Sequence, residues 1–179
     1  KDQISDSINT KDGIKFLEKS SFEKTLIKSI EPWLENNYKI EVLASGMVGS
    51  KQGWMEAPYQ KTPCNLNRIE FISPAVIDNR FSLKIFSGIS QSNKPDVMRG
   101  EETQIAGFIY DNPNFNGSIC LPGTHSKWVK IENGNIICFK TFMTGELFDI
   151  ISKNSILIHS VTSNKVLKNE LKMAVDEIF

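Results

Sequence analysis

The chain has 179 residues, 40% hydrophobic and 23% charged, which is the composition of an ordinary globular protein of one domain or pieces of two. Lysine plus arginine and aspartate plus glutamate both number 21, so the net charge of zero gives no support to nucleic acid or an anionic membrane as the main partner. No apolar run approaches the length of a membrane span.

The three cysteines, Cys64, Cys120 and Cys138, are odd in number and form no Cys-x-x-Cys pair. Because Cys120 and Cys138 lie in apolar runs, we expect buried, reduced thiols. The start of the sequence does not have the pattern of a signal peptide, so a cytoplasmic protein is expected.

The first clear pattern along the chain is a helix that begins near Ser20. Ser20 and Glu23 have the spacing of a capping box, and Pro32 should kink or restart the helix. The apolar side chains fall on one stripe: Phe22, Leu26, Ile27, Ile30 and Leu34. The pattern at 13–17 fits a short helix, and residues 39–44 predict a strand running into a core.

A loop rich in glycine and serine, residues 45–54, follows this strand. Such a loop can approach a ligand closely, although a flexible connection is the simpler interpretation. The sequence is equally compatible with Trp54 and Tyr59 packing in a hydrophobic core and with their lining a pocket. Residues 66–78 are ambiguous between helix and strand, whereas 81–86 alternates as a strand.

Arg99, Glu101 and Glu102 stand at the start of a predicted helix, after a polar loop at 89–98. Acidic residues in the first turn of a helix interact favourably with the positive end of the helix dipole and so stabilise the helix. This is the simplest interpretation of the two glutamates. The functional alternative is that one carboxylate projects into a cleft as a general base. In that case Arg99 is suited to bind a carboxylate group of the substrate, although a salt bridge on the protein surface accounts for an arginine at this position equally well.

Residues 118–142 predict a three-stranded meander. Its first turn, residues 122–127, presents backbone N–H groups, hydroxyls and the ammonium of Lys127, which together suit an anion such as phosphate. The alternative is an ordinary tight turn with a surface lysine. The second turn, 133–134, is an Asn-Gly pair and a strong type I′ hairpin signal.

A helix capped at residues 144–146 follows, and then a short apolar run, 156–159, in which His159 is interpreted as structural. Residues 167–179 form an amphipathic helical pattern that stops without a cap. A carboxylate at a helix start and a turn for phosphate are the two parts that a sugar kinase needs. A Walker A motif and the protein-kinase loops are absent, which argues against those two classes.

Four blocks of sequence resemble the 2-dehydro-3-deoxygalactonokinase family and occur in the family's order. They are Ser45-Gly-Met-Val-Gly-Ser50 with Gly53-Trp54 and Ala57-Pro58-Tyr59, Val97-Met-Arg-Gly-Glu-Glu-Thr-Gln104, Leu121-Pro-Gly-Thr-His-Ser-Lys-Trp-Val129 and Met143-Thr-Gly-Glu-Leu147. The resemblance implies an α/β protein of the actin-like, ribonuclease-H-type ATPase fold, with two lobes and the active site between them. It also implies phosphoryl transfer from ATP, with Mg²⁺, to the 6-hydroxyl of 2-dehydro-3-deoxy-D-galactonate in galactonate breakdown.

The resemblance also implies roles for individual residues. Glu101 is implied as the catalytic base, by analogy with the Gly-Asp-Gln segment of the wider sugar-kinase superfamily, and Glu102 as its neighbour or a helix cap. The residues implied in substrate binding are Met47, Gly49, Ser50, Trp54, Arg99 and Glu102. The residues implied in phosphate or ATP binding are Gly123, Thr124, His125, Lys127, Thr144 and Gly145, and no residue is implied as a metal ligand.

Some of the family pattern is absent: an Asp-Trp-Gly-Thr-type phosphate turn, the adenosine-binding glycine motif, and a His where Asn154 stands. We therefore expect a fold incomplete at both ends, with a sugar-binding lobe at 1–113 that lacks its first strands and a truncated nucleotide-binding lobe at 114–179. Such a chain is expected to be inactive alone. The alternatives are a non-catalytic sugar-acid or phosphate-binding fragment and a structural module without ligand; a homodimer is compatible with each.

Overall fold

The computed structural model describes residues 3–160 and residue 173, which form two compact units. The first unit comprises Lys1–Leu121 and Lys127–Thr141, and the second comprises Pro122–Ser126 and Phe142–Phe179. The lobes expected at 1–113 and 114–179 divide the chain elsewhere, and they stay a prediction. The amphipathic pattern at 167–179 lies outside the described residues, apart from residue 173.

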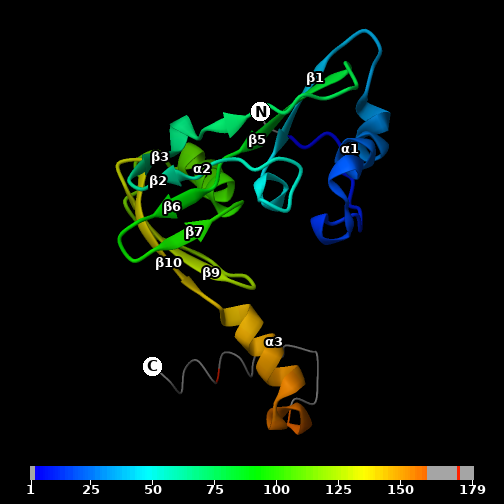
Figure 1. Ribbon diagram of the computed structural model, residues 1–179. Helices are drawn as coiled ribbons and strands as arrows, with labels where there is room; N and C mark the ends of the chain where they lie inside the picture. The colour runs from blue at the N-terminus through cyan, green and yellow to red at the C-terminus, as the bar shows by residue number, and fades with distance from the viewer. Residues whose placement is uncertain (1–2, 161–172, 174–179) are drawn as a thin grey trace. The chain divides into compact units, whose positions relative to one another are not determined.

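The described part of the chain is a mixed α/β structure with three small sheets (Figure 1). The first sheet, in the order β1-β5-β4, contains β1 (Ile40–Ala44), β4 (Phe71–Ile72) and β5 (Phe81–Phe86). The second, β2-β6-β7, contains β2 (Gln60–Lys61), β6 (Ile89–Gln91) and β7 (Asp96–Met98). The third, β3-β10-β9-β8, contains β3 (Cys64–Asn65), β8 (Gly117–Leu121), β9 (Ser126–Glu132) and β10 (Asn135–Phe142).

The helices in the described residues are α1 (Phe22–Ile30), α2 (Glu101–Asp111) and α3 (Thr144–Asn154). The predicted restart at Pro32 is confirmed, because α1 ends at Ile30 and a 3₁₀ turn, Glu31–Trp33, takes over. The predicted capping box is wrong. The N-cap of α1 is Ser21, and its side chain makes no capping hydrogen bond.

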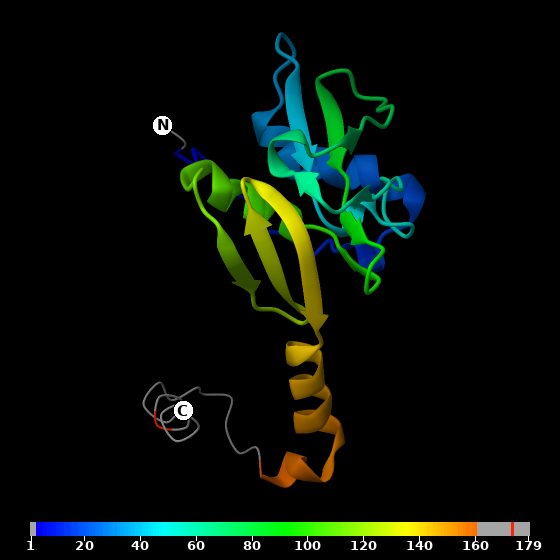
Figure 2. The ribbon, with the colours of Figure 1, turned by 90° about the vertical axis from the view of Figure 1, so that its left-hand side faces the viewer.

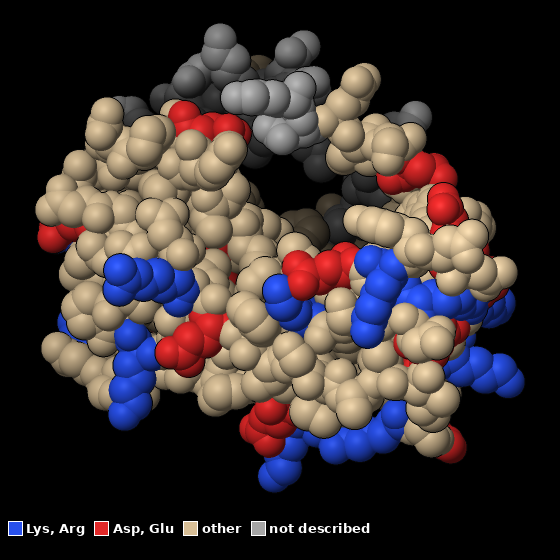
Figure 3. Space-filling view, turned by 90° about the horizontal axis from the view of Figure 1, so that it is seen from above, with Lys and Arg blue, Asp and Glu red and all other residues tan. Residues whose placement is uncertain are grey.

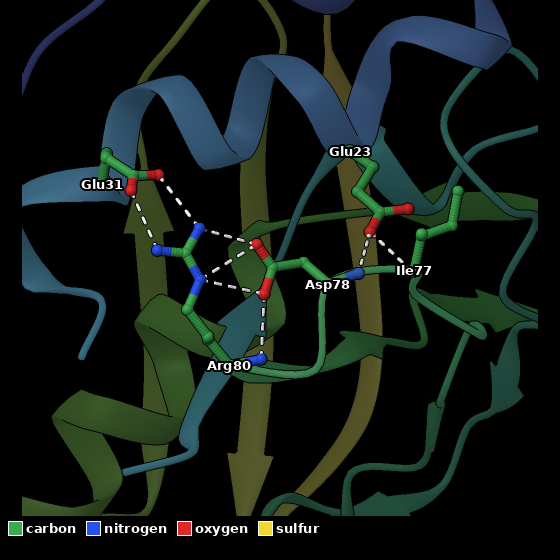
Figure 4. Close-up of polar contacts among 5 residues, drawn as sticks. All are labelled: Glu23, Glu31, Ile77, Asp78 and Arg80. Atoms are coloured by element: carbon green, nitrogen blue, oxygen red, sulfur yellow. Dashed lines mark hydrogen bonds and ion pairs between the residues drawn. The ribbon is translucent and has the colours of Figure 1, made fainter. Parts of the chain in front are cut away.

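Glu23, the other half of the predicted box, is used to hold a distant turn (Figure 4). Its Oε1 accepts hydrogen bonds from the N–H groups of Ile77 at 2.6 Å and Asp78 at 2.9 Å. Beside it, the guanidinium of Arg80 pairs with Asp78 at 2.7 Å and with Glu31 at 2.9 Å. Hydrogen bonds from Arg80 lower the pKa of both carboxyl groups. The two ends of α1 are thereby tied to the segment that leads into β5.

The first core forms where α1 covers the sheet of β1 and β5. These strands are parallel, in the register Ile40↔Phe81 to Ala44↔Ile85, and alternate residues of β5 are buried. The core comprises Ala57, Phe81, Leu83 and Ile85, with part of the predicted α1 stripe packed against it. Because every second residue of β5 is apolar and buried, β5 presents an apolar surface, and α1 packs against it.

The second core lies between α2 and the third sheet, whose strands β8, β9 and β10 run side by side in Figure 2. The buried residues from these elements are Ile105, Ile109, Val129, Ile131, Ile136 and Phe139. The predicted meander and its type I′ turn are confirmed, with positive φ angles of 50° at Asn133 and 72° at Gly134.

The expectation of buried thiols is confirmed for Cys64 and wrong for Cys120 and Cys138, which are exposed. Cys120 lies on the more exposed face of β8, whose residues alternate in burial, whereas β10 does not alternate strictly, and Cys138 is exposed between the buried Ile136 and Phe139. Burial raises the pKa of the Cys64 thiol to about 11.

Basic and acidic side chains are interspersed on the face drawn in Figure 3, which matches the balanced charge of the sequence. Among the residues that the structure describes, no helix combines the length and the apolar character needed to cross a bilayer.

Candidate functional site

The loop that follows β1 closes into a short 3₁₀ turn, Met47–Gly49, after Gly46, whose φ is 90°. Hydrogen bonds hold it from both sides: Gly49 N–H donates to Gly46 O at 3.1 Å, and Ala57 N–H donates to Gly49 O at 3.0 Å. Met47 is exposed, whereas Gly49 and Ser50 are buried. The hydroxyl of Ser50 has no hydrogen-bond partner among the described residues. The predicted ligand loop is thus an ordered turn.

This loop packs on the first turn of α2, where the sequence predicts a carboxylate and an arginine. Ser45 Oγ and Thr103 Oγ1 are 3.0 Å apart, and Thr103 Oγ1 also donates to Gly100 O at 2.7 Å. Gly100 has a φ of 111°, and a Cβ there would lie 3.3 Å from the Cα of Gly46. Only glycine meets both demands without strain. The structure therefore brings together two of the segments implied in sugar binding.

Arg99 lies against this loop with its guanidinium held in place. It stacks 4.3 Å from the ring centroid of Tyr59 and donates from Nη2 to Ala57 O at 2.8 Å. Its Nη1 is buried without a partner among the described residues, and a Cβ on Gly49 would come within 2.9 Å of it. An unpaired buried guanidinium nitrogen is costly, so it is a candidate for binding an acidic group.

Glu101 and Glu102 both fold back on the main chain just before α2. The carboxylate of Glu101, which is partly exposed, accepts the N–H of Arg99 at 2.9 Å. Glu102 is fully buried, and its oxygens accept the N–H of Gly100 at 2.7 and 2.8 Å. Burial raises the pKa of Glu102 to about 7, against the opposing effect of these N–H groups. Glu101 is thus the more accessible carboxylate, and Glu102 the one that changes charge near neutrality.

Trp54, also implied in substrate binding, points into a different part of the first unit. Its ring stacks on Phe22 of α1 with centroids 6.0 Å apart. It also lines an apolar cavity of about 220 Å³, together with Val42, Val48 and Leu83 among others. Arg99 and the two carboxylates are not among the residues that line this cavity.

Lys127 is held inside the first unit. Its side chain is buried, and Nζ donates to Val97 O at 2.7 Å and to Thr141 Oγ1 at 2.6 Å, with Asp96 at 4.0 Å. The alternative interpretation as a surface lysine is wrong. Its phosphate-binding role stays a prediction. In this structure the ammonium group of Lys127 donates its hydrogen bonds to protein oxygens.

The remaining residues implied in phosphate binding come together within the second unit. The N–H of Gly145 donates to Gly123 O at 3.2 Å, and His125 Nε2 lies 2.5 Å from a carboxylate oxygen of Glu146. The hydroxyl of Thr144 is hydrogen-bonded to that of Ser126. These contacts therefore hold the turn 122–126 against the first turn of α3. The active site expected between two lobes, with Glu101 as base and Thr124 at the phosphate, stays a prediction, since these residues belong to different units.

Five side chains that contribute contacts to these clusters were not predicted as site residues: Ser45, Tyr59, Thr103, Ser126 and Glu146. Each lies inside or beside a sequence block that carries the family resemblance, so the signal was present but its meaning depended on contacts. In the described part of the chain no group of three or more His, Cys, Asp or Glu residues is placed to hold a metal ion.

Comparison with known proteins gives concordant results. The model of the 2-keto-3-deoxy-galactonokinase family matches residues 1–178. A protein of Rhizobium meliloti (strain 1021), named as a probable 2-dehydro-3-deoxygalactonokinase, DgoK1, is 43% identical over 124 residues, which are 68% of this chain and 40% of that protein. The 2-dehydro-3-deoxygalactonokinase of Escherichia coli (strain K12) is 34% identical over 158 residues, 87% of this chain and 52% of the relative.

Among solved structures, a protein from Sinorhizobium meliloti, provisionally assigned as a 2-dehydro-3-deoxygalactonokinase, superposes with a TM-score of 0.72 at 36% sequence identity. The match covers 82% of this chain and 48% of that one. The chain spans about half the length of the curated relatives that it matches. With a family model that covers nearly all of its residues, the chain belongs to the 2-keto-3-deoxy-galactonokinase family.

Proposed function

We propose that this chain supplies the sugar-acid side, and part of the phosphate side, of an ATP-dependent kinase. The kinase phosphorylates 2-dehydro-3-deoxy-D-galactonate at its 6-hydroxyl, in an actin-like fold of two lobes. Family membership and the names of the relatives support this substrate. The observation that carries the proposal is the cluster in which the loop 45–50 meets Arg99, Glu101 and Glu102.

In this proposal the sugar acid binds with its carboxylate at Arg99. The stacked guanidinium offers the unpartnered Nη1, and a planar nitrogen donor suits a carboxylate oxygen. Ser50 contributes its free hydroxyl from the adjoining turn. A neutral ligand would leave the guanidinium of Arg99 without a carboxylate partner, so an acidic sugar is favoured over a neutral one.

The reacting hydroxyl is deprotonated by Glu101. Its oxygen attacks the γ-phosphorus of ATP, a new O–P bond forms, and the bond between that phosphorus and the ADP oxygen breaks; the hydroxyl proton goes to the carboxylate. We favour Glu101 over Glu102 because a base must reach substrate, and Glu102 is fully buried. Glu102 has the role of fixing the main chain at Gly100. Mg²⁺ would neutralise charge on the ATP phosphates.

Binding of the sugar acid to the chain tests the first part of this proposal. In isothermal titration calorimetry, Arg99→Lys should weaken binding of 2-dehydro-3-deoxy-D-galactonate by about tenfold, because a planar donor pair is lost. Arg68→Lys is the matched control, since Arg68 is exposed and only its main-chain oxygen is engaged. Equal binding by both variants, or no binding by the unmodified chain, would reject the assignment of Arg99.

The base is tested by turnover in a full-length kinase that contains this sequence. Glu101→Gln should lower kcat by about 10²–10⁴-fold, as expected for loss of a general base, with sugar-acid binding largely kept. Unchanged turnover would reject Glu101 as the base. The second candidate function is a non-catalytic fragment that binds the sugar acid. Binding of the sugar acid by this chain alone, without consumption of ATP, would support that candidate.

A further inference from the structure

One end of the second sheet brings together three residues that are far apart in the sequence. Tyr59 directly precedes β2, Gly88 directly precedes β6, and Arg99 directly follows β7. Because β6 is parallel to β2 and antiparallel to β7, the starts of β2 and β6 and the end of β7 lie at the same end of the sheet. In the strand order β2-β6-β7, Gly88 therefore stands between Tyr59 and Arg99 (Figure 1).

The missing side chain of Gly88 lets the two long side chains meet. Neighbouring strands are about 5 Å apart, so residues on β2 and β7 touch only if their side chains cross the middle strand. A Cβ on Gly88 would lie 2.7 Å from a ring carbon of Tyr59 and 2.5 Å from Met98 O. The ring of Tyr59 therefore lies against Gly88, with the guanidinium of Arg99 stacked 4.3 Å from the ring centroid.

Main-chain hydrogen bonds fix the same arrangement. The N–H of Gln60, the residue after Tyr59, donates to Gly88 O at 2.9 Å. On the other side of Tyr59, Ala57 O accepts Nη2 of Arg99 at 2.8 Å. The phenol ring is thus held in place before any ligand binds, which lowers the entropic cost of using it for recognition.

The hydroxyl of Tyr59 has a proton to give. Arg99 Nε donates to the hydroxyl oxygen in a long contact of 3.4 Å, which uses an acceptor site of that oxygen. The O–H itself donates to no residue that the structure describes. Because hydrogen bonds in a chain polarise one another, a hydroxyl that accepts from a guanidinium is a stronger donor to an anionic oxygen.

This hydroxyl is also more accessible than the donors already placed in the acid-binding site. Tyr59 is 39% exposed, whereas Arg99 Nη1 and Ser50 Oγ are buried. Arg99 contacts Tyr59 with the end of its side chain and the carboxylate of Glu101 with its main-chain N–H. A donor for an acid group and the proposed base are thus at opposite ends of one arginine, which suits a substrate with its acid group and its reacting hydroxyl at opposite ends.

We propose that the hydroxyl of Tyr59 donates a hydrogen bond to the carboxylate of the sugar acid, beside Arg99, and that Gly88 positions the tyrosine ring for this contact. The proposal rests on the function proposed above, because it adds an accessible donor to the acid-binding side of the same site. Tyr59 is then a specificity-determining residue that selects acidic sugars, and Gly88 is a positioning residue.

The first test is Tyr59→Phe, which removes the hydroxyl and keeps the stacked ring. In isothermal titration calorimetry, 2-dehydro-3-deoxy-D-galactonate should bind about tenfold more weakly or worse, the effect of losing one hydrogen bond to a charged group. Tyr110→Phe is the matched control, because Tyr110 is 78% exposed, and it should bind as the unmodified chain does. A lowered melting temperature of Tyr59→Phe with unchanged binding would show a structural hydroxyl and overturn the proposal.

The group that Tyr59 contacts is tested by combining Tyr59→Phe with Arg99→Lys. If both side chains hold one carboxylate, the double variant should lose less affinity than the product of the two single effects. In a full-length kinase that contains this sequence, Tyr59→Phe should raise KM about tenfold and leave kcat within about twofold, because the acid group is held equally in the ground and transition states. Independent effects, or a lower kcat with unchanged KM, would overturn the assignment to the carboxylate.

The role of Gly88 is tested by Gly88→Ala, which should displace the ring and weaken sugar-acid binding at least as much as Tyr59→Phe does. Adding Tyr59→Phe to Gly88→Ala should cause little further loss, because the displaced hydroxyl no longer reaches the ligand. Binding by Gly88→Ala equal to that of the unmodified chain would overturn the positioning role. Should Gly88→Ala not fold, Tyr59→Phe decides the proposal.

The outcomes separate this inference from the proposed function. Sugar-acid binding that Tyr59→Phe leaves unchanged would overturn the inference and leave the proposed function in place. Binding of D-galactonate that depends on Tyr59, without binding of 2-dehydro-3-deoxy-D-galactonate, would support the inference and reject the proposed substrate. Binding of neither acid would reject the two proposals together.

Discussion

The loop 45–50 and the turn 122–126 are built alike, since each lies beside a β-strand and packs on the first turn of a helix. At the start of α2, Glu101 and Glu102 take up main-chain N–H groups, and the donor left without a partner is a side-chain atom, Arg99 Nη1. At the start of α3, turn carbonyls take up the helix N–H groups, and the free donors are main-chain amides. The same packing therefore leaves a side-chain donor free in one place and main-chain donors free in the other.

The strongest test of this comparison is Lys127→Met, at the residue that follows the turn. We expect a loss of about 3–5 kcal/mol in the free energy of unfolding, because a buried cation is removed and Asp96 and Val97 O lose a partner. Urea denaturation measures it. Lys130→Met, which breaks an exposed pair with Glu132, should change stability by less than about 1 kcal/mol. Unchanged stability with weaker ATP binding would instead make Lys127 the phosphate ligand.

A smaller effect is expected from Gly100→Ala, which separates the loop from α2. The positive φ of 111° and the close approach to Gly46 should cost about 1–3 kcal/mol in stability. Sugar-acid binding should weaken as well, since Arg99 and Glu101 flank this position. Gly107→Ala in the same helix serves as the control for denaturation and calorimetry. If both variants bind the sugar acid equally, the loop and the helix start do not act together.

The smallest effect concerns pH, and it sharpens the difference between the two carboxylates. The pKa of Glu102 is about 7 in the folded protein and 4.5 ordinarily, so the folded state holds its proton more tightly. Stability is therefore highest below pH 4.5, falls as pH rises toward 7, and then levels off. Denaturation at pH 6 and pH 8 should differ by about 1–2 kcal/mol from this group. Glu102→Gln should remove that difference; if it persists, another group causes it.

Local patterns predicted most elements of the fold. The alternation of β5, the helix start at Glu101 and the Asn-Gly turn at 133–134 each depend on neighbours within a few residues, and the structure confirms them. The glycine-containing segments 45–50 and 122–126 were predicted as a loop and a turn, and the structure confirms this. Their ligand-binding role stays a prediction, and their packing on helix starts was not predictable from residue type.

Two of the errors concern residues whose partners are far away in sequence. Lys127 is buried because it meets Val97, 30 positions earlier. Glu23 serves a turn 54 and 55 positions later, so its local spacing with Ser20 carried no information about its role. Charge and spacing identify a polar side chain, and only the tertiary contacts decide whether it faces solvent, ligand or protein.

The two exposed thiols of the third sheet have a chemical consequence of their own. Cys120 on β8 and Cys138 on β10 are both exposed, and β9 runs between their strands. Two strand spacings amount to about 10 Å, beyond the reach of a disulfide. Air oxidation should therefore join separate molecules into covalent dimers and longer chains instead of bridging the two thiols internally, and the protein should be handled with a reductant.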